Sequence, residues 1–458
     1  MKTRDENIIL LTDSYKVSHW KQYPPNTTHV YSFFESRGGR YPTTNFFGLQ
    51  YFIKRYLEGQ VVTREKIDEA REMFKLHFGQ DLMNLGGWEH ILEHHGGRLP
   101  ILIKAVPEGM NVPVSNVLIT VENICPELPW LTNYVETLIS EVWYPTTVAN
   151  QSRAMRQVIF AALEKTGDPT LIDFKLHDFG FRGSTSPESA GLGGAAHLVN
   201  FKGTDTIAAL TVARDYYGEP MAGFSIPAAE HSTITSWGRG READAFRNML
   251  EQFPAGLVAV VSDSYNVFEA CRELWGKELW QKVMDRDGTL VVRPDSGHPP
   301  TVVLEVLNIL GEAFGFTENA KGYKVLHPKI RVIQGDGIDY IMLEEILNAI
   351  TKAGWSADNI AFGSGGGLLQ KLDRDTQKFA FKCSAIRVNG LWQDVMKDPV
   401  TDHSKKSKAG RMKLVNENGQ LRTVRLEDTR AKDILLTVFE DGKLTRDYSL
   451  AEIRKLAN

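Results

Sequence analysis

Acidic and imidazole side chains follow a series of short apolar runs, at the point where each run ends. Glu230 and His231 stand side by side after one run, and Asp263 follows the next. Asp295 and Asp336 come after two further runs. A carboxylate can fix the tautomer of a histidine, and an imidazole oriented in this way is a base or a nucleophile, including a phosphoryl acceptor. We therefore take His231, with Glu230, Asp263 and Asp295, as candidate catalytic residues.

A glycine-rich turn follows another apolar run and is suited to anions. Gly363-Ser-Gly-Gly-Gly367 comes directly after residues 360–362, so its backbone N–H groups can form a nest around a phosphate. The turn lacks the Lys-Ser/Thr of a Walker loop and does not fit the dinucleotide fingerprint, and a plain tight turn explains it equally well. Three basic residues near the C-terminal boundary are candidates to meet phosphates, although a solvated surface is the ordinary explanation for each: Arg374, Lys382 and Lys397.

The apolar runs recur between residue 171 and about residue 370 with the rhythm of strand, loop and helix. The acids after them are separated by 52, 33, 32 and 41 residues: Asp178, Glu230, Asp263, Asp295 and Asp336. One strand–helix unit suits the shorter gaps, and the longest gap leaves room for an additional unit near residues 199–208. The run that begins near Ala222 predicts a short strand that ends at Glu230. Buried parallel strands that deliver polar residues at their C-terminal ends are typical of α/β barrels, so the sequence favours a barrel over an open sheet.

Length and rhythm predict a second domain beside the barrel. At 458 residues the chain exceeds what one core usually holds. We predict an α+β N-terminal part over residues 1–165, a (β/α) barrel catalytic domain over residues 166–375 and a β-rich C-terminal part over residues 376–458. The N- and C-terminal segments are expected to pack together as one composite α+β domain.

Composition excludes several classes of protein. A hydrophobic content of 42% and a charged content of 24% are those of a soluble globular protein, and the net charge of −4 argues against a general nucleic-acid binder. The three cysteines lie far apart, so their spacing matches neither a metal-ligand motif nor a disulfide framework. The first apolar run is too short for a signal peptide, and no later run approaches membrane-spanning length. We expect a cytoplasmic protein that binds neither nucleic acid nor membrane.

Long motifs across the chain resemble those of the nicotinamide phosphoribosyltransferases. They run in order from about residue 8 to residue 455: Asp13-Ser-Tyr-Lys16, Lys175-Leu-His-Asp-Phe-Gly-Phe-Arg-Gly183, Asn200-Phe-Lys-Gly-Thr-Asp205, Pro227-Ala-Ala-Glu-His-Ser-Thr-Ile-Thr235, Val261-Ser-Asp-Ser-Tyr265, Arg293-Pro-Asp-Ser-Gly297, Val332-Ile-Gln-Gly-Asp-Gly337 and Ala361-Phe-Gly-Ser-Gly-Gly-Gly-Leu-Leu-Gln370. The resemblance implies a type II phosphoribosyltransferase fold and a homodimer with active sites at the subunit interface. The implied reaction is that of nicotinamide with phosphoribosyl pyrophosphate and Mg²⁺, giving nicotinamide mononucleotide and pyrophosphate in NAD salvage. ATP hydrolysis through a phosphohistidine is also implied, at the position of His231.

The same resemblance implies a role for individual side chains. Phe179 and Tyr15 of the partner subunit would sandwich the pyridine ring, and Asp205 would accept its carboxamide N–H. Arg182 and Arg293 would line the base and phosphate region. The other implied contacts are to ribose or metal-bound pyrophosphate (Asp295, Asp336), to the 5′-phosphate (Gly335, Gly365, Gly366) and to pyrophosphate or ATP phosphates (Arg37, Arg374, Lys382, Lys397). Mg²⁺ would be held mainly through the substrate pyrophosphate, with no certain protein ligand.

Other functions remain open at the level of the sequence. A phosphoribosyltransferase for nicotinate is the nearest alternative, but its carboxylate substrate would face Asp205, and like charges in contact are costly in a desolvated pocket. A barrel aldolase or isomerase would explain the carboxylates and the phosphate nest, yet the strand ends offer no obvious Schiff-base lysine. A non-enzymatic scaffold would leave the pocket residues unexplained. Ala380 and the short loop after Arg37 depart from the family pattern and leave ATP coupling and its regulation open.

Overall fold

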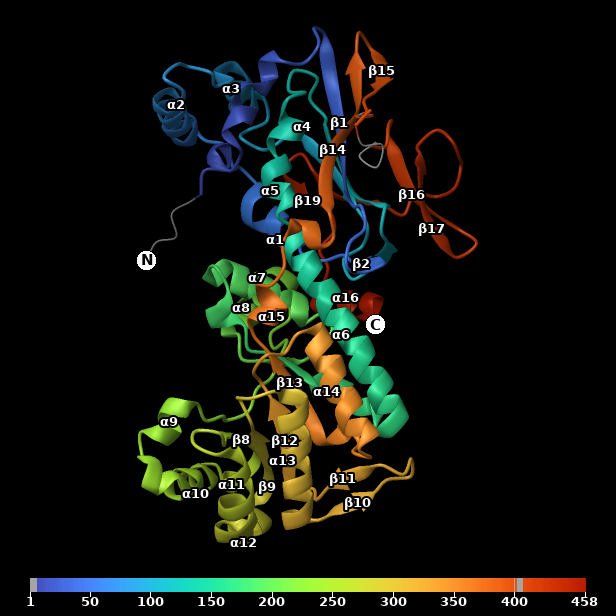
Figure 1. The fold of residues 1–458 in the computed structure, drawn as a ribbon. Helices are drawn as coiled ribbons and strands as arrows, with labels where there is room; N and C mark the ends of the chain where they lie inside the picture. The colour runs from blue at the N-terminus through green and yellow to red at the C-terminus, as the bar shows by residue number, and fades with distance from the viewer. Residues whose placement is uncertain (1–5, 399, 402–406) are drawn as a thin grey trace. The chain divides into compact units, whose positions relative to one another are not determined.

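The computed structural model describes residues 6–398, 400–401 and 407–458, which form two compact units (Figure 1). The first unit comprises residues 1–150, 215–218 and 372–458, and the second comprises residues 151–214 and 219–371. The first change of unit lies inside helix α6 (Trp143–Thr166), before the division at residue 165 that the sequence suggested. The start of α6 belongs to the first unit, where the Thr146 hydroxyl donates to the Phe47 carbonyl at 2.9 Å. Its later turns belong to the second, where Arg156 donates to Asp173 at 3.0 Å.

The first unit is built on a sheet that mixes both ends of the chain. Its seven strands follow the order β15-β14-β1-β5-β3-β18-β19. Their bounds are β1 Thr27–Ser36, β3 Ile101–Ala105, β5 Val117–Asn123, β14 Phe379–Val388, β15 Leu391–Asp394, β18 Leu436–Glu440 and β19 Lys443–Leu444. N-terminal β1 pairs antiparallel with C-terminal β14, placing Phe33 opposite Lys382. The prediction of a composite α+β domain is therefore confirmed.

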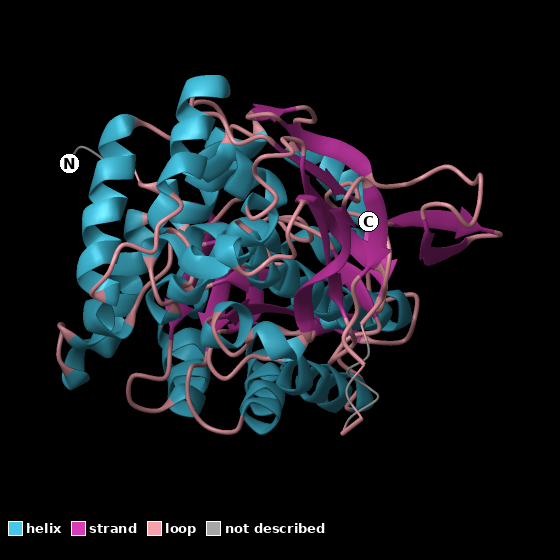
Figure 2. Cartoon of the chain, turned by 90° about the horizontal axis from the view of Figure 1, so that it is seen from above, coloured by secondary structure: helices cyan, strands magenta, loops and turns pink. Residues whose placement is uncertain are grey.

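Helices and two smaller ladders complete the first unit. The helices are η2 Ser14–Lys21, α1 Leu49–Phe52, α2 Arg64–Phe78, α3 Leu85–His94, α4 Leu131–Tyr134, α5 Glu136–Ser140 and α16 Leu450–Ala457. The smaller ladders pair β2 Thr43–Asn45 with β4 Asn111–Pro113, and β16 Met412–Glu417 with β17 Gln420–Arg425. The β16–β17 hairpin stands out from the rest of its unit in both ribbon views (Figures 1 and 2).

The second unit contains a parallel sheet whose strand order is β7-β6-β13-β12-β9-β8. The strands are β6 Leu176–Asp178, β7 Gly203–Thr204, β8 Ala255–Val261, β9 Asp287–Arg293, β12 Ile330–Gln334 and β13 Ile360–Ser364. Two parallel bridges join the outer strands through one segment: Phe224 pairs with Gly203, the first residue of β7, and Ala228 pairs with Ala259 of β8. Residues 224–228 therefore span the gap and close the sheet into a barrel, which confirms the predicted fold class.

The closing segment is less regular than the sequence predicted. The strand expected to end at Glu230 is reduced to these two bridges. Pro227 has no backbone N–H, so it cannot donate to a ladder, although its carbonyl accepts from Ala259 N at 2.9 Å. The neighbouring Ala229 N–H donates to the Ala259 carbonyl at 2.9 Å. The segment keeps enough pairing to hold the residues that follow it against β8.

Amphipathic helices pack around the barrel. Helix α13 (Pro299–Phe314) buries Val303, Val306 and Leu310, at the helical spacing that the sequence shows. The other helices of this unit are α7 Pro187–His197, α8 Ile207–Tyr217, α9 His231–Thr235, α10 Glu242–Gln252, α11 Val267–Glu269, η7 Ala270–Glu278, α12 Trp280–Asp285, α14 Tyr340–Lys352 and α15 Gly366–Leu369. A small ladder pairs β10 Phe316–Glu318 with β11 Lys324–Leu326.

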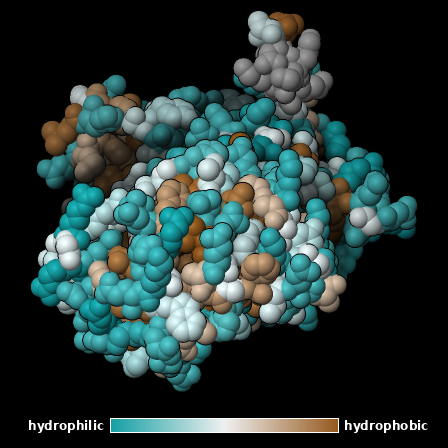
Figure 3. Space-filling view, turned by 60° about the horizontal axis from the view of Figure 1, so that its bottom comes forward, coloured by the Kyte–Doolittle hydropathy of each residue, from teal (hydrophilic) through white to brown (hydrophobic). Residues whose placement is uncertain are grey.

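The surface is mixed in polarity. The face drawn in Figure 3 is mainly hydrophilic, with hydrophobic residues interspersed among the polar ones. Within the described part of the chain, every helix is too short or too polar to span a lipid bilayer.

Candidate active site

The chemistry-bearing residues of the barrel follow the C-terminal ends of its strands. Asp178 ends β6, Arg293 ends β9, and Asp263 lies two residues beyond β8. Asp336 and Gly365 occupy the corresponding positions after β12 and β13. Since parallel strands bring their carboxyl ends to one edge of a barrel, residues far apart in the sequence meet there.

His231 is the first residue of α9 and is held by a buried acid. Its Nε2 lies 2.9 Å from Oδ1 of Asp263, which is only 3% exposed, and its Nδ1 lies 3.9 Å from Oδ2 of Asp295. If Nε2 donates its proton to Asp263, Nδ1 carries the free lone pair. The carboxylate of Glu230 accepts a hydrogen bond from the Ser232 hydroxyl. Glu230 therefore organises the start of α9.

Asp295 stands in a strongly acidic environment. Burial raises its pKa above the ordinary value, and the neighbouring carboxylates of Asp263 and Asp336 raise it further. Arg293 and His231 act in the opposite direction, with Arg293 Nε 3.8 Å from Asp295 Oδ1. The buried Nε of Arg293 has no hydrogen-bond partner among the described residues. The cluster can therefore receive a cation at its carboxylates and a polar ligand atom at Arg293.

A polar cavity of about 240 Å³ lies over this cluster. Its walls are formed by Phe179, Arg182, Gly183, Arg293, Asp295, Gly335, Asp336, Gly365 and Gly366. An added Cβ at Gly366 would meet nothing within 4 Å, and one at Gly365 would touch only the Phe179 carbonyl at 3.6 Å. Neither glycine is required by internal packing, so the space above their backbone is available to a ligand. Backbone N–H groups beside two arginines suit a phosphate.

A larger and mostly apolar cavity of about 570 Å³ extends through the barrel beside the polar one. Phe179 and Arg293 line both cavities. Asp205 and Ser225 supply polar groups to the larger one, and the Ser225 hydroxyl donates a hydrogen bond to the Asp205 carboxylate. A flat apolar ring beside a few convergent polar groups is the usual design of a site for a small aromatic molecule.

Phe179 is held at the junction of the two cavities by main-chain contacts. Its N–H donates to the Ser364 carbonyl at 3.0 Å, which ties it to β13. Its ring lies against Gly363, where an added Cβ would come within 2.0 Å of the ring carbons. Glycine is therefore needed at this position for the ring to lie against β13. Gly335 is close as well, because an added Cβ there would lie 3.3 Å from the same ring.

Two residues beside Asp205 were not singled out from the sequence as site residues. Ser225 is a polar residue in the apolar closing run, and that break in the run was the available signal. His177 lines the larger cavity, and its Nε2 lies 3.0 Å from the Phe174 carbonyl. Burial lowers the pKa of His177, which favours the neutral ring, and Asp205 partly opposes this effect. Ser225 is brought to the site by the segment that closes the barrel, and His177 by the pairing of β6 with β7, and the sequence displays neither contact.

Five other predicted site residues belong to the first unit. Tyr15 lies on η2 with its side chain 59% exposed, its ring edge-on to His19 at a centroid distance of 4.9 Å. The other four are basic and electrostatically coupled. Burial lowers the pKa of Lys382, Glu136 raises it, and the remaining cations lower it: Arg37, Arg374 and Lys397. Their convergence from β14, the end of β1, the short helix η9 (Arg374–Thr376) and one loop makes a positive cluster suited to phosphate groups.

The fold and the strand-end site agree with the relationships of the sequence. The chain belongs to the nicotinate phosphoribosyltransferase (NAPRTase) family, whose sequence model matches residues 174–443. Residues 7–103 match the N-terminal domain of nicotinamide phosphoribosyltransferase, which places the chain in that branch of the family.

Whole-chain relatives support the same branch. The chain is 52% identical to the nicotinamide phosphoribosyltransferase of Xanthomonas campestris pv. campestris over 464 residues, covering 99% of this chain and 98% of the relative. Identity to the protein of the same name from Acinetobacter baylyi is 33%, covering 98% and 96% of the two chains.

Two solved structures share the fold at low sequence identity. Nicotinate-nucleotide pyrophosphorylase from Pyrococcus furiosus superposes with a TM-score of 0.61 at 15% identity, covering 100% of this chain and 96% of the other. Human nicotinic acid phosphoribosyltransferase gives a TM-score of 0.55 at 16% identity, with 98% and 93% covered. The likeness to these two concerns the fold alone.

Proposed function

We propose that the protein transfers the phosphoribosyl group from phosphoribosyl pyrophosphate to nicotinamide, giving nicotinamide mononucleotide and pyrophosphate in NAD salvage. The observation that carries this is the 52% identity over nearly the whole chain to a nicotinamide phosphoribosyltransferase. The two adjoining cavities suit the two substrates, because one is apolar with a few polar groups and the other is polar with a glycine-rich wall. Phe179 and Arg293 line both cavities, so they would bring the base and the ribose together.

The reaction requires accurate positioning of the two substrates more than it requires a general base. The ring nitrogen of nicotinamide already carries a free lone pair and forms the new bond to the anomeric carbon as pyrophosphate departs. Phe179 would hold the pyridine ring by stacking, and Arg293 would bridge base and phosphate. Arg182, Gly335, Gly365 and Gly366 would receive the 5′-phosphate, and Asp336 would hold the ribose. Fixed donors and charges around the leaving group would supply most of the rate enhancement.

Choice between the amide and the acid would rest on Asp205. Its carboxylate already accepts from Ser225 and retains acceptor capacity for a carboxamide N–H. A nicotinate carboxylate in the same place would meet a like charge in a mostly apolar cavity. A direct test incubates the protein with phosphoribosyl pyrophosphate, Mg²⁺ and either base, and resolves the products by mass. Nicotinamide mononucleotide as the main product supports the proposal, and a clear preference for nicotinate contradicts it.

The residues present fit a magnesium ion. Burial and two neighbouring carboxylates raise the pKa of Asp295, so a divalent cation near Asp295 and Asp336 would relieve their repulsion. Mg²⁺ would neutralise charge on the departing pyrophosphate. We propose that it is held mainly by the substrate, with Asp295 and Asp336 nearby. Omission of Mg²⁺ is expected to abolish synthesis, and full activity in chelator would contradict this.

We propose that His231 accepts a phosphoryl group from ATP. Nδ1 would attack the γ-phosphorus, the bond to the bridging oxygen would break, and ADP would leave with its electron pair. The hydrogen bond from Nε2 to buried Asp263 would stabilise the positive charge that develops on the ring. The side chain is 46% exposed and accessible to a nucleotide. A phosphate placed there would add negative charge near Asp295 and help to organise Mg²⁺ with the donor substrate.

The phosphoryl transfer is tested with γ-³²P-labelled ATP. Acid-labile label should appear on the wild-type protein and on His77→Ala, which removes an exposed histidine of the other unit. It should be absent from His231→Ala, which should also lose ATP hydrolysis and its stimulation of synthesis. Slow ATP-independent synthesis should persist. Label retained on folded His231→Ala would place the phosphoryl group elsewhere.

We also propose that the enzyme is a homodimer with shared sites. The support is the resemblance of the motif around Tyr15 and the exposure of its ring, 59%, on a residue that would stack on a base. Tyr15→Ala and Asp205→Ala should each be inactive, and mixing the two chains should restore activity because hybrids keep one intact site. Native mass spectrometry would verify that hybrids form. Hybrids without activity would reject a shared site.

A further inference from the structure

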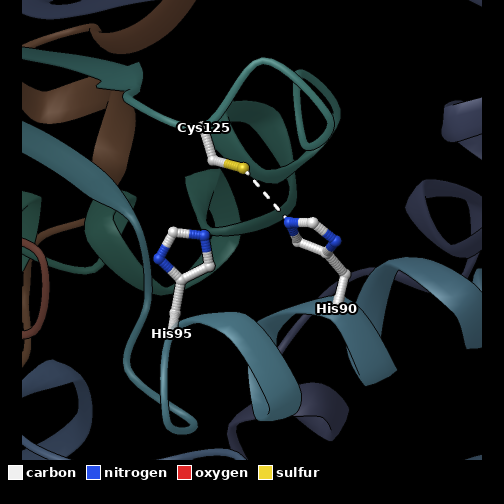
Figure 4. A group of neighbouring side chains, drawn as sticks. All are labelled: His90, His95 and Cys125. Atoms are coloured by element: carbon white, nitrogen blue, oxygen red, sulfur yellow. Dashed lines mark hydrogen bonds between the residues drawn. The ribbon is translucent and has the colours of Figure 1, made fainter.

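Two histidines and a cysteine meet in the first unit, separate from the residues assigned above. His90 lies on α3, His95 follows the end of that helix, and Cys125 lies in the loop after β5 (Figure 4). One possible ligand atom from each of the three lies within 4.8 Å of the others. Within the part of the chain that the structure describes, no other group of three or more His, Cys, Asp or Glu side chains brings its ligand atoms so close together.

The distances suit a tetrahedral transition-metal ion. Cys125 Sγ lies 3.5 Å from His90 Nε2. With Zn–S of about 2.3 Å and Zn–N of about 2.0–2.1 Å, tetrahedral angles place a sulfur and a nitrogen ligand about 3.5 Å apart. Figure 4 shows a ring nitrogen of His95 on the side of Cys125 and His90. Modest rotation of the His95 side chain would complete a three-ligand face.

An acid beside the thiol is available as a fourth ligand, and a second acid faces His95. The Cys125 thiol donates a hydrogen bond to Glu127 Oε2 at 3.0 Å, which places this carboxylate next to the three-residue group. On the other side of His95, Nδ1 lies 3.6 Å from Oδ1 of Asp441. That Asp441 oxygen is buried and has no hydrogen-bond partner among the described residues. A carboxylate facing the far nitrogen of a ligating histidine is a usual feature of metal sites.

The main chain holds the cysteine and the helix end in position. The Asn123 side-chain amide donates to the Cys125 carbonyl at 2.7 Å, and the Ile124 N–H donates to the Pro100 carbonyl at 2.9 Å. The His95 N–H continues the helical pattern to Ile91 at 3.1 Å. The ligand-bearing backbone is therefore fixed before any ion arrives, which reduces the entropy lost on binding.

We propose that Cys125, His90, His95 and Glu127 bind one Zn²⁺ ion per chain, with Asp441 orienting His95. Two histidines and one thiolate with a carboxylate favour a borderline-soft ion over Mg²⁺ or Ca²⁺. The ion links the C-terminal end of α3 to the loop that enters α4, and its role is structural. The site is independent of the proposed phosphoribosyl transfer, since none of its four ligands lines the barrel cavities.

Cobalt substitution provides the decisive measurement. The full-length, metal-free protein is titrated with Co²⁺, then with Zn²⁺. Wild type should show a thiolate-to-cobalt charge-transfer band that saturates at one equivalent and disappears on addition of Zn²⁺. Cys125→Ser should lose the band, while Cys271→Ser, which changes a buried cysteine of the other unit, should retain it. Absence of the band in the wild type, or its retention in Cys125→Ser, overturns the proposal.

Two histidine variants and one acid variant extend the test. His95→Ala should weaken Zn²⁺ binding by at least about a hundredfold, whereas His77→Ala should leave it unchanged. Asp441→Asn should weaken binding about ten- to a hundredfold, as expected for the partner of a ligating histidine. Zn²⁺ should raise the thermal midpoint of the wild type and not that of His95→Ala. Equal Zn²⁺ affinity in wild type and His95→Ala would reduce the cluster to a set of stacked, hydrogen-bonded side chains.

Discussion

The two cavities of the barrel share a wall but differ in the side chains that line them. The larger cavity, of about 570 Å³, is lined mainly by apolar side chains, with Asp205 and Ser225 among its polar groups. The smaller, of about 240 Å³, is lined by Phe179, glycines, arginines and acids. Phe179 and Arg293 belong to both. Under the proposed function, shape would select the base and charge would select the sugar phosphate, while the two shared residues would impose their relative position.

Two glycines, Gly363 and Gly366, show the same contrast in how they pack. Gly363 is required by the protein itself, because a Cβ there would collide with Phe179. Gly366 is not, because a Cβ there would stand in open space. Glycine in one place makes room for a side chain of the protein, and in the other it leaves room for a ligand.

The largest of these effects is expected at Arg293, one of the two residues common to both cavities. Arg293→Ala should lower kcat/KM roughly 10²–10³-fold, the range seen when one charged or polar donor to a transition state is removed. It also leaves Asp295 with less positive charge around it. Arg293→Lys should recover only part, since a lysine lacks the guanidinium fork. Steady-state kinetics with both substrates varied should show losses for both. A loss confined to one substrate would show that the arginine serves a single cavity.

Selectivity for the base should change at Asp205. Asp205→Asn replaces a charged acceptor, and a lost hydrogen bond to a charged group is worth roughly 1.5–3 kcal/mol, about ten- to a hundredfold in kcat/KM for nicotinamide. Removal of the negative charge should also admit nicotinate better. Competition between the two bases, resolved by mass, measures the ratio. An unchanged ratio in the folded variant would remove Asp205 from base selection.

The two glycines form a matched pair for the next test. Gly363→Ala should destabilise the fold by about 1–3 kcal/mol, because the methyl group displaces the Phe179 ring. It should also raise KM for nicotinamide. Gly366→Ala should leave the thermal midpoint unchanged and raise KM for phosphoribosyl pyrophosphate about tenfold. Thermal unfolding and kinetics on both variants separate the two roles. Equal losses of stability would show that both glycines serve internal packing.

The smallest expected effect is a pH dependence at Asp178. Burial raises the pKa of this carboxyl from 3.8 to about 6, and Asp205 contributes to the rise. Because the folded state binds the proton more tightly, stability should fall as pH rises between about 4 and about 6 and then level off. One group can contribute no more than about 1.4 kcal/mol per pH unit. Asp178→Asn should flatten this part of the profile.

The Asp178 profile is measured by urea unfolding of both proteins at several pH values from 4.5 to 7. The difference between wild type and variant cancels the other titrating groups. The Asp178 Oδ1 atom accepts from the Gly180 N–H at 2.7 Å, and an asparagine oxygen can keep that bond. Identical slopes in the two proteins would mean that Asp178 is charged throughout the range.

The sequence predicted much of the secondary structure because local patterns specify it. The apolar runs that precede Asp263, Asp295 and Asp336 were visible without a structure and became β8, β9 and β12. The spacing of the acids predicted the barrel, because each strand–helix unit has a typical length. The division predicted at residue 165 falls inside one continuous helix, α6, which enters both units.

Other features were decided by tertiary structure. The strand expected before Glu230 became two bridges, because Pro227 interrupts the donors while the barrel still has to close there. Ser225 meets Asp205 only because that segment closes the sheet, 20 residues further along the chain. The three cysteines showed no ligand spacing in the sequence, yet Cys125 meets His90 and His95 across the fold of the first unit.

By itself the sequence determined which chemical groups follow each strand, and its long motifs determined the family. Those are properties of local order, since a residue that follows a strand stays at its end in any fold that keeps the strand. Only the tertiary structure decided which of those groups touch: His231 with Asp263, Phe179 with Gly363, and Asp205 with Ser225. Such contacts depend on barrel closure and on the register of neighbouring strands, which arise from packing between distant segments.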